Sequence, residues 1–139
     1  MPWTEALLVK YEDIFDECVQ CSPPDGWRIL VESLIEYIHW HNTVHDTDVK
    51  VVSISEAHGG LKFVILNQPR QPIIAEEIFG AIHLAETMSC KMCQVCAAPA
   101  EFRKYRDSNN KLILQALCDS HFEEKMNEIN MAETEDSSR

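Results

Sequence analysis

Two short cysteine motifs late in the chain limit its fold more than any other feature. The first is Cys93-x-x-Cys96 and the second is Cys118-x-x-His121. Three thiolates and one imidazole form a common closed ligand set for tetrahedral zinc, and soft sulfur ligands favour zinc over magnesium or calcium. The sequence therefore predicts a Zn²⁺ ion at these four residues, which would supply folding energy to a small module.

A third cysteine, Cys90, precedes the first motif at the same spacing and offers an alternative pair with Cys93. Cys96 is followed by Ala-Ala-Pro, whose small residues let the backbone turn tightly and point its amides at sulfur. Cys90 directly follows a predicted helix, and pairing it with Cys93 would leave Cys96 inside the turn. We therefore predict that Cys93 and Cys96 are the ligands and that Cys90 is not.

The predicted zinc is structural rather than catalytic, because four protein ligands leave no coordination position for an activated water. The sequence also has no His-x-Glu followed by Pro-Cys-x-x-Cys, the order found in zinc deaminases. No nucleophile arrangement or phosphate-binding glycine pattern stands out either. We expect a protein that is not an enzyme.

Hydrophobic periodicity predicts an α+β body of order α-α-β-β-α over residues 1–89. Apolar residues at helical intervals indicate helices at 4–20, 26–41 and 73–89. Alternating segments on both sides of Gly59-Gly60 indicate an antiparallel β-hairpin, on which the helices would pack.

Residues 90–131 are predicted to form a zinc-finger-like module, and residues 132–139 an acidic flexible tail. Within the module, the segments 101–106 and 111–118 read as a second hairpin, and Asp119 as the cap of a last helix. A cysteine turn, a hairpin and a helix whose start gives two ligands resemble a treble-clef finger.

The remaining cysteines and histidines support no second site. Cys18 and Cys21 form a C-x-x-C pair outside the strand–helix context of a redox motif, and Cys18 falls on an apolar helical face, so we expect a buried structural cysteine. His39 and His41 are two apart on a predicted helix and do not face one another. Positions at the surface or at a helix end explain these histidines best.

Charge and hydropathy indicate a cytoplasmic protein with a protein partner. The formal net charge is −11, the first residues do not resemble a signal peptide, and no apolar stretch is long enough to span a membrane. An acidic surface repels nucleic acid and suits basic partners. In a reducing compartment the six cysteines favour metal binding or free thiols over disulfides.

The hairpin of the zinc module carries the one basic patch, formed by Arg103, Lys104 and Arg106. Zinc fingers often place such a patch on phosphates, which makes nucleic-acid binding an alternative function. Charge balance with the acidic tail explains the patch as well and is favoured, because the acidic body would weaken binding to nucleic acid.

The segments "DGW", "SISEAHGGLKF" and "CQVCAAPAEFRKY…LCDSH" together resemble a family of small bacterial and phage proteins. Its members have a Gly-Trp pair at a helix start, a Gly-Gly-Leu-[Arg/Lys]-Phe hairpin and a C-x-x-C…L-C-x-x-H finger. The resemblance covers residues 25–122 and implies the same four zinc ligands, with Ala97 and Ala100 standing where glycines are usual. It implies an architecture rather than an activity.

The closed metal set, the absence of a catalytic arrangement, the acidity and the small size favour one function. We expect a protein that acts by binding another protein, as an inhibitor or immunity-type factor of bacterial or phage origin would.

Overall fold

The computed structural model describes residues 2–137, with side chains described as far as Ala132. Helices alternate with two small sheets in this part of the chain, in agreement with the predicted α+β class. Two short 3-10 turns, η1 (Glu12–Ile14) and η2 (Asp25–Trp27), flank the first strand. The helices and strands are α1 (Trp3–Lys10), β1 (Phe15–Cys21), α2 (Arg28–Val44), β2 (Lys50–Ala57), β3 (Gly60–Leu66), α3 (Pro72–Ser89), β4 (Glu101–Arg106), β5 (Leu112–Leu117) and α4 (Asp119–Ser137).

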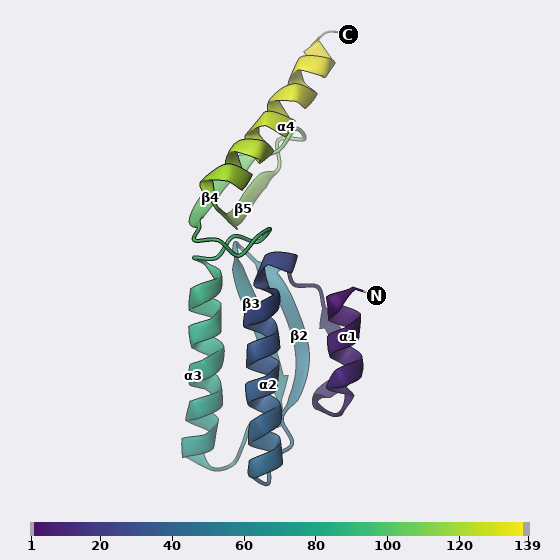
Figure 1. Ribbon diagram of the computed structural model, residues 1–139, viewed down its shortest axis with the longest axis vertical. Coiled ribbons are helices and arrows are strands. Elements are labelled where there is room, and N and C mark those ends of the chain that lie inside the picture. Colours follow the sequence, from purple (N-terminus) through teal and green to yellow (C-terminus); the bar gives the residue numbers. More distant parts are fainter. Residues whose placement is uncertain (1, 138–139) are drawn as a thin grey trace.

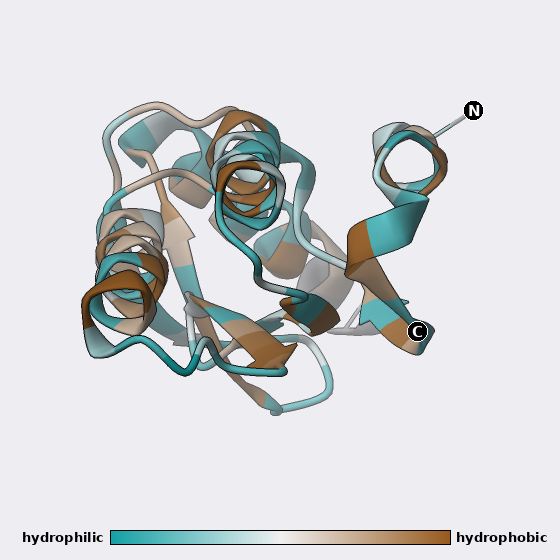
Figure 2. Ribbon diagram, turned by 90° about the horizontal axis from the view of Figure 1, so that it is seen from below, coloured by the Kyte–Doolittle hydropathy of each residue, from teal (hydrophilic) through white to brown (hydrophobic). Residues whose placement is uncertain are grey.

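The molecule consists of a body and a smaller module stacked along its long axis. Helices α1 to α3 and strands β1 to β3 form the body, whereas β4, β5 and α4 form the module, from which α4 extends to the C-terminal end (Figure 1). The three body helices run side by side and are seen end-on from below (Figure 2). The turn that follows α3 joins the two parts, and it carries Cys93 and Cys96.

The predicted helix over residues 4–20 is wrong beyond Lys10. After a 3-10 turn the chain forms β1, which pairs in parallel with β2 through Phe15↔Val51 and Cys21↔Ile54. Strand pairing depends on a partner far along the chain, and this contact overrides the local helical periodicity. The body sheet therefore has the order β1-β2-β3 and is mixed, instead of being a single antiparallel hairpin.

The expectation for Cys18 is also wrong. Cys18 is exposed on β1, because the apolar helical face that would bury it does not exist. His41 lies in the last turn of α2, which agrees with the predicted position at a helix end, but it is fully buried rather than at the surface. Its ring stacks on that of His45 at a centroid distance of 5.2 Å. Burial lowers the pKa of His41, although Glu77 opposes this shift.

The hairpin formed by β2 and β3 and the helices α2 and α3 are close to their predicted positions. The hairpin turns at His58 and Gly59, which both have positive φ. Asp25, at the start of η2, accepts a hydrogen bond from the indole of Trp3. The core between sheet and helices contains fully buried side chains from α2, β2 and α3, namely Val31, Ile35, Ile38, Val51, Ile54 and Ile78.

The module has a small hydrophobic cluster of its own, centred on Cys93, Tyr105 and Leu117. Half-buried residues of α4 complete the cluster at helical intervals, so one face of this helix packs on the β4–β5 hairpin. Helix α4 continues to Ser137, and most of the predicted flexible tail is therefore helical. The last two residues of that tail, 138–139, lie outside the described residues.

Among the described residues, no helix is both long enough and apolar enough to cross a membrane.

Candidate metal centre

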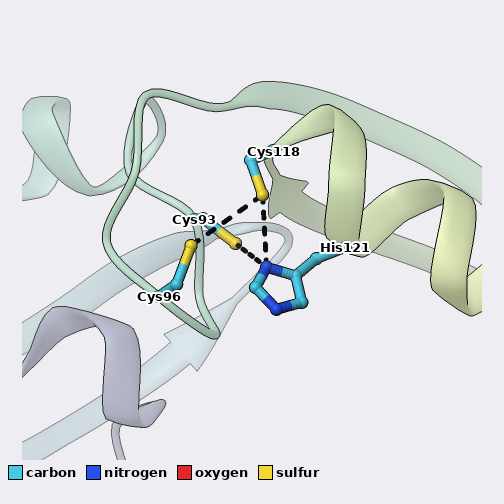
Figure 3. Close-up of side chains that lie close together, drawn as sticks. All are labelled: Cys93, Cys96, Cys118 and His121. Carbon is cyan, nitrogen blue, oxygen red and sulfur yellow. Dashed lines mark hydrogen bonds between the residues drawn. The ribbon is translucent and has the colours of Figure 1, made fainter.

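The four predicted ligands come together where the body meets α4. Cys93 and Cys96 lie in the turn after α3, Cys118 directly follows β5, and His121 lies in the first turn of α4 (Figure 3). Their ligand atoms all lie within 4.8 Å of one another. The structure thus brings together the residues that the spacing selects, in an arrangement compatible with a metal site.

Three of the distances between these atoms are close to those expected around one tetrahedral ion. Nδ1 of His121 lies 3.6 Å from Sγ of Cys93 and 3.2 Å from Sγ of Cys118, and the sulfurs of Cys96 and Cys118 are 3.8 Å apart. Zinc bonds of about 2.3 Å to sulfur and about 2.0 Å to nitrogen place two sulfurs roughly 3.8 Å apart, and a sulfur and a nitrogen roughly 3.5 Å apart. The side chains therefore need little movement to surround an ion.

The turn that holds Cys93 and Cys96 is closed by its own backbone. The N–H of Cys93 donates to the carbonyl of Ala98 over 2.8 Å, and the N–H of Ala97 donates to the carbonyl of Cys93 over 2.9 Å. Closing this turn requires a left-handed residue, and Ala97 has a φ of 68°. Glycine adopts this conformation at least cost, so alanine is less favourable than glycine at this position.

The environment of the sulfurs favours a bound cation. Burial alone would raise the pKa of Cys93, but backbone hydrogen bonds from Cys118, Val95 and Cys96 lower it to about 6. At Cys96 a hydrogen bond from the Ala98 backbone lowers the pKa, but desolvation and the neighbouring thiols together raise it above its ordinary value. Adjacent thiolates repel one another, so a divalent cation is needed to hold all three ionised.

Cys90 stays outside the cluster. It is exposed at the end of α3, where its thiol donates to the carbonyl of Glu86 over 3.5 Å. Cys90 therefore belongs to the body. It lies at the C-terminal end of α3, where its thiol is hydrogen-bonded to the last turn of the helix.

Arg103, predicted as a contact residue, joins the residues on either side of Cys118. Its Nε donates to the carbonyl of Leu117, and its Nη2 donates to the carboxylate of Asp119, so the guanidinium spans Cys118. It also lies over the ring of Phe122 at 4.6 Å, and its side chain is only 15% exposed. Asp119 therefore serves as a partner of Arg103 at the start of α4.

The other two basic residues of the predicted patch remain at the surface. Lys104 is exposed on β4, and the exposed Arg106 donates to the carbonyl of Asn110 across the hairpin turn. The structure thus separates Arg103, which is engaged within the module, from the two cations that are accessible to a partner.

Replacing Arg103 with glutamine is expected to weaken zinc binding by about tenfold, because residues that orient metal ligands commonly contribute this much. Competition with a chromogenic chelator measures the affinity. Lys104→Gln removes the same charge from an exposed neighbour and should leave the affinity unchanged. Equal affinities for both variants would show that Arg103 does not position the site.

The Asp25-Gly26-Trp27 motif docks the body onto the cysteine turn, a role that the sequence did not reveal. The N–H of Gly26 donates to the carbonyl of Gln94 over 2.8 Å. The indole of Trp27, which is fully buried, donates to the carbonyl of Met92 over 3.1 Å. The start of α2 is thereby fixed against both sides of Cys93.

The tip of the β2–β3 hairpin makes a second contact with the module. Gly59 has a φ of 90°, and a Cβ built on it would lie 2.6 Å from the ring of Phe102 on β4. A Cβ on Gly60 would lie 3.0 Å from the sulfur of Cys90, within the body. Gly59 does more than form a tight turn, because it also allows the module to approach the body closely.

Comparison of the chain with protein-family models, with curated proteins and with solved structures finds no match. The resemblance to a bacterial and phage family therefore stays a prediction.

Proposed function

We propose that the protein binds one zinc ion per chain through Cys93, Cys96, Cys118 and His121, and that this ion is structural. The observation that carries the proposal is the convergence of three thiols and one imidazole within 4.8 Å. Four such ligands complete a tetrahedron, and the sulfur atoms select against magnesium and calcium. The cysteine turn, the β4–β5 hairpin and α4 then form a treble-clef-like module around the ion.

We further propose that the protein is a non-enzymatic cytoplasmic factor that acts by binding another protein. A complete ligand set leaves the metal no open position at which to activate water. The net charge of −11 favours a partner with a basic surface. An inhibitor or immunity-type factor of bacterial or phage origin fits these properties.

Nucleic-acid binding through the basic hairpin has less support. Arg103 already pairs with Glu101 and Asp119, which leaves Lys104 and Arg106 as the accessible cations of the patch. A contact with few phosphates gives weak binding that salt readily disrupts.

Affinity capture with the tagged, zinc-loaded protein tests the proposal of a protein partner. Bacterial lysate, treated with nuclease or left untreated, is passed over the protein and over a metal-free sample. We expect a reproducible protein partner whose recovery resists nuclease. Recovery that depends on intact nucleic acid would favour the basic hairpin, and no reproducible partner would contradict protein binding.

A further inference from the structure

A groove between α3 and β3 has a largely apolar lining. It encloses about 680 Å³, and its apolar walls are Phe63, Val64 and Ile65 from β3 with Phe79 and Ile82 from α3. Phe79 is 42% exposed, so its side chain is available to a ligand.

Gly80 lies in this groove, and the packing of the chain gives no reason for a glycine there. It is within α3, where glycine is about 1 kcal/mol less favourable than alanine. A Cβ built on it would meet nothing within 4 Å, in contrast to Gly26, Gly59 and Gly60. The missing side chain leaves the backbone of α3 open to close approach from outside.

The charged side chains of the groove are acidic. Glu76 and Glu86 both line it, and Glu86 is held in place because it accepts a hydrogen bond from the N–H of Phe63 over 3.2 Å. Among the described residues that line the groove, the only other titratable side chain is that of His83. An apolar ligand with positive charges at its edges is therefore complementary to this surface.

The free edge of β3 is partly protected from the addition of another strand. The N–H groups of Leu61 and Phe63 donate to the side chains of Ser89 and Glu86 on α3. Such pairing removes backbone donors that an added strand would need. A ligand would therefore bind through side chains that enter the groove.

We propose that this groove is the docking site for the protein partner, and that the partner presents a short apolar segment flanked by lysine or arginine. The segment approaches α3 most closely at Gly80, and its cations lie near Glu76 and Glu86. This inference rests on the proposed protein-binding function and names the surface and the partner chemistry that this function requires.

Selection from a library of random displayed peptides against the zinc-loaded full chain tests the proposal. We expect selected peptides to combine apolar residues with lysine or arginine. Fluorescence anisotropy then compares peptide binding by the wild type and by Gly80→Leu, which fills the groove and should lose at least about tenfold in affinity. Thr87→Leu adds the same side chain to α3 outside the groove and should bind as the wild type does.

Charge reversal gives a second measurement. Glu76→Lys should weaken binding of the same peptides, whereas Glu123→Lys, a matched change on the exposed side of α4, should not. Thermal unfolding of each variant checks the fold, and Gly80→Leu should unfold no earlier than the wild type because the site is open.

Several results would overturn the groove assignment: no peptide binds, the selected peptides lack basic residues, or Gly80→Leu binds as tightly as the wild type. A dimer that Gly80→Leu abolishes in sedimentation experiments would make a second copy of this chain the occupant. Capture of a partner by both the wild type and Gly80→Leu would support protein binding but reject the groove as the docking site. Peptide binding at the groove without any captured partner would support the groove as a binding surface but contradict the proposed protein-binding function.

Discussion

We expect the replacement of Cys118 with serine to abolish stoichiometric zinc binding and to unfold the module, whereas Cys90→Ser should keep one zinc ion per chain. Serine retains the shape of the side chain but supplies no thiolate, and the remaining three ligands no longer close the tetrahedron. The hydrophobic cluster of the module is small, and its buried residues are Cys93, Tyr105 and Leu117. Structural zinc contributes on the order of 10 kcal/mol in comparable small modules, which exceeds what such a cluster supplies.

Metal analysis of the purified variants gives the zinc content, and limited proteolysis reports whether β4, β5 and α4 remain folded. Cys90→Ser is the matched control. It makes the same substitution at a cysteine that lies outside the cluster, although Cys90 precedes Cys93 by the same interval that separates Cys93 from Cys96. Loss of zinc in Cys90→Ser together with its retention in Cys96→Ser would mean that the wrong pair was chosen.

Acid should also release zinc from the wild-type protein, because protons compete with zinc for the thiolates. The lowered pKa of Cys93 keeps one thiolate available to about pH 6, but the raised pKa of Cys96 makes its deprotonation depend on the metal. Zinc binding displaces protons from the thiols. Zinc affinity should therefore fall as the pH is lowered.

The sequence was sufficient to predict that the four candidate ligands lie close together, because this depends on spacing within one local module. The pairs Cys93–Cys96 and Cys118–His121 each span one turn, and the hairpin between them brings the pairs together. The hairpin of β2 and β3 and the helix α3 were also predicted from local periodicity. Local signals and tertiary structure agree in these segments.

The sequence was insufficient where tertiary contacts determine the local structure. Residues Phe15–Cys21 fit a helical pattern, but parallel pairing with β2 makes them a strand, and Cys18 becomes exposed as a result. The buried position of His41 likewise depends on the packing of α3 beside α2, since Glu77 lies 3.4 Å from its ring. No periodicity within one segment contains this information.

The two glycines Gly26 and Gly80 show how differently the fold uses the same residue. A Cβ on Gly26 would lie 2.1 Å from the carbonyl oxygen of Cys93 and 2.6 Å from the carbonyl carbon of Gln94. These are backbone atoms of the cysteine turn, so they cannot move aside without displacing Cys93, a candidate metal ligand. A Cβ on Gly80 meets nothing within 4 Å.

Gly26→Ala should therefore destabilise the protein by about 2–4 kcal/mol, as expected for an overpacked site that also loses a buried hydrogen bond. Gly80→Ala should stabilise it by up to about 1 kcal/mol, because alanine is the better helix former. Urea unfolding of the two zinc-loaded variants measures both changes. Since the clash lies at Cys93, Gly26→Ala should also lower zinc affinity, whereas Gly80→Ala should not. Equal stability of the two variants would show that the body does not dock on the cysteine turn through Gly26, and the metal would then organise the module alone.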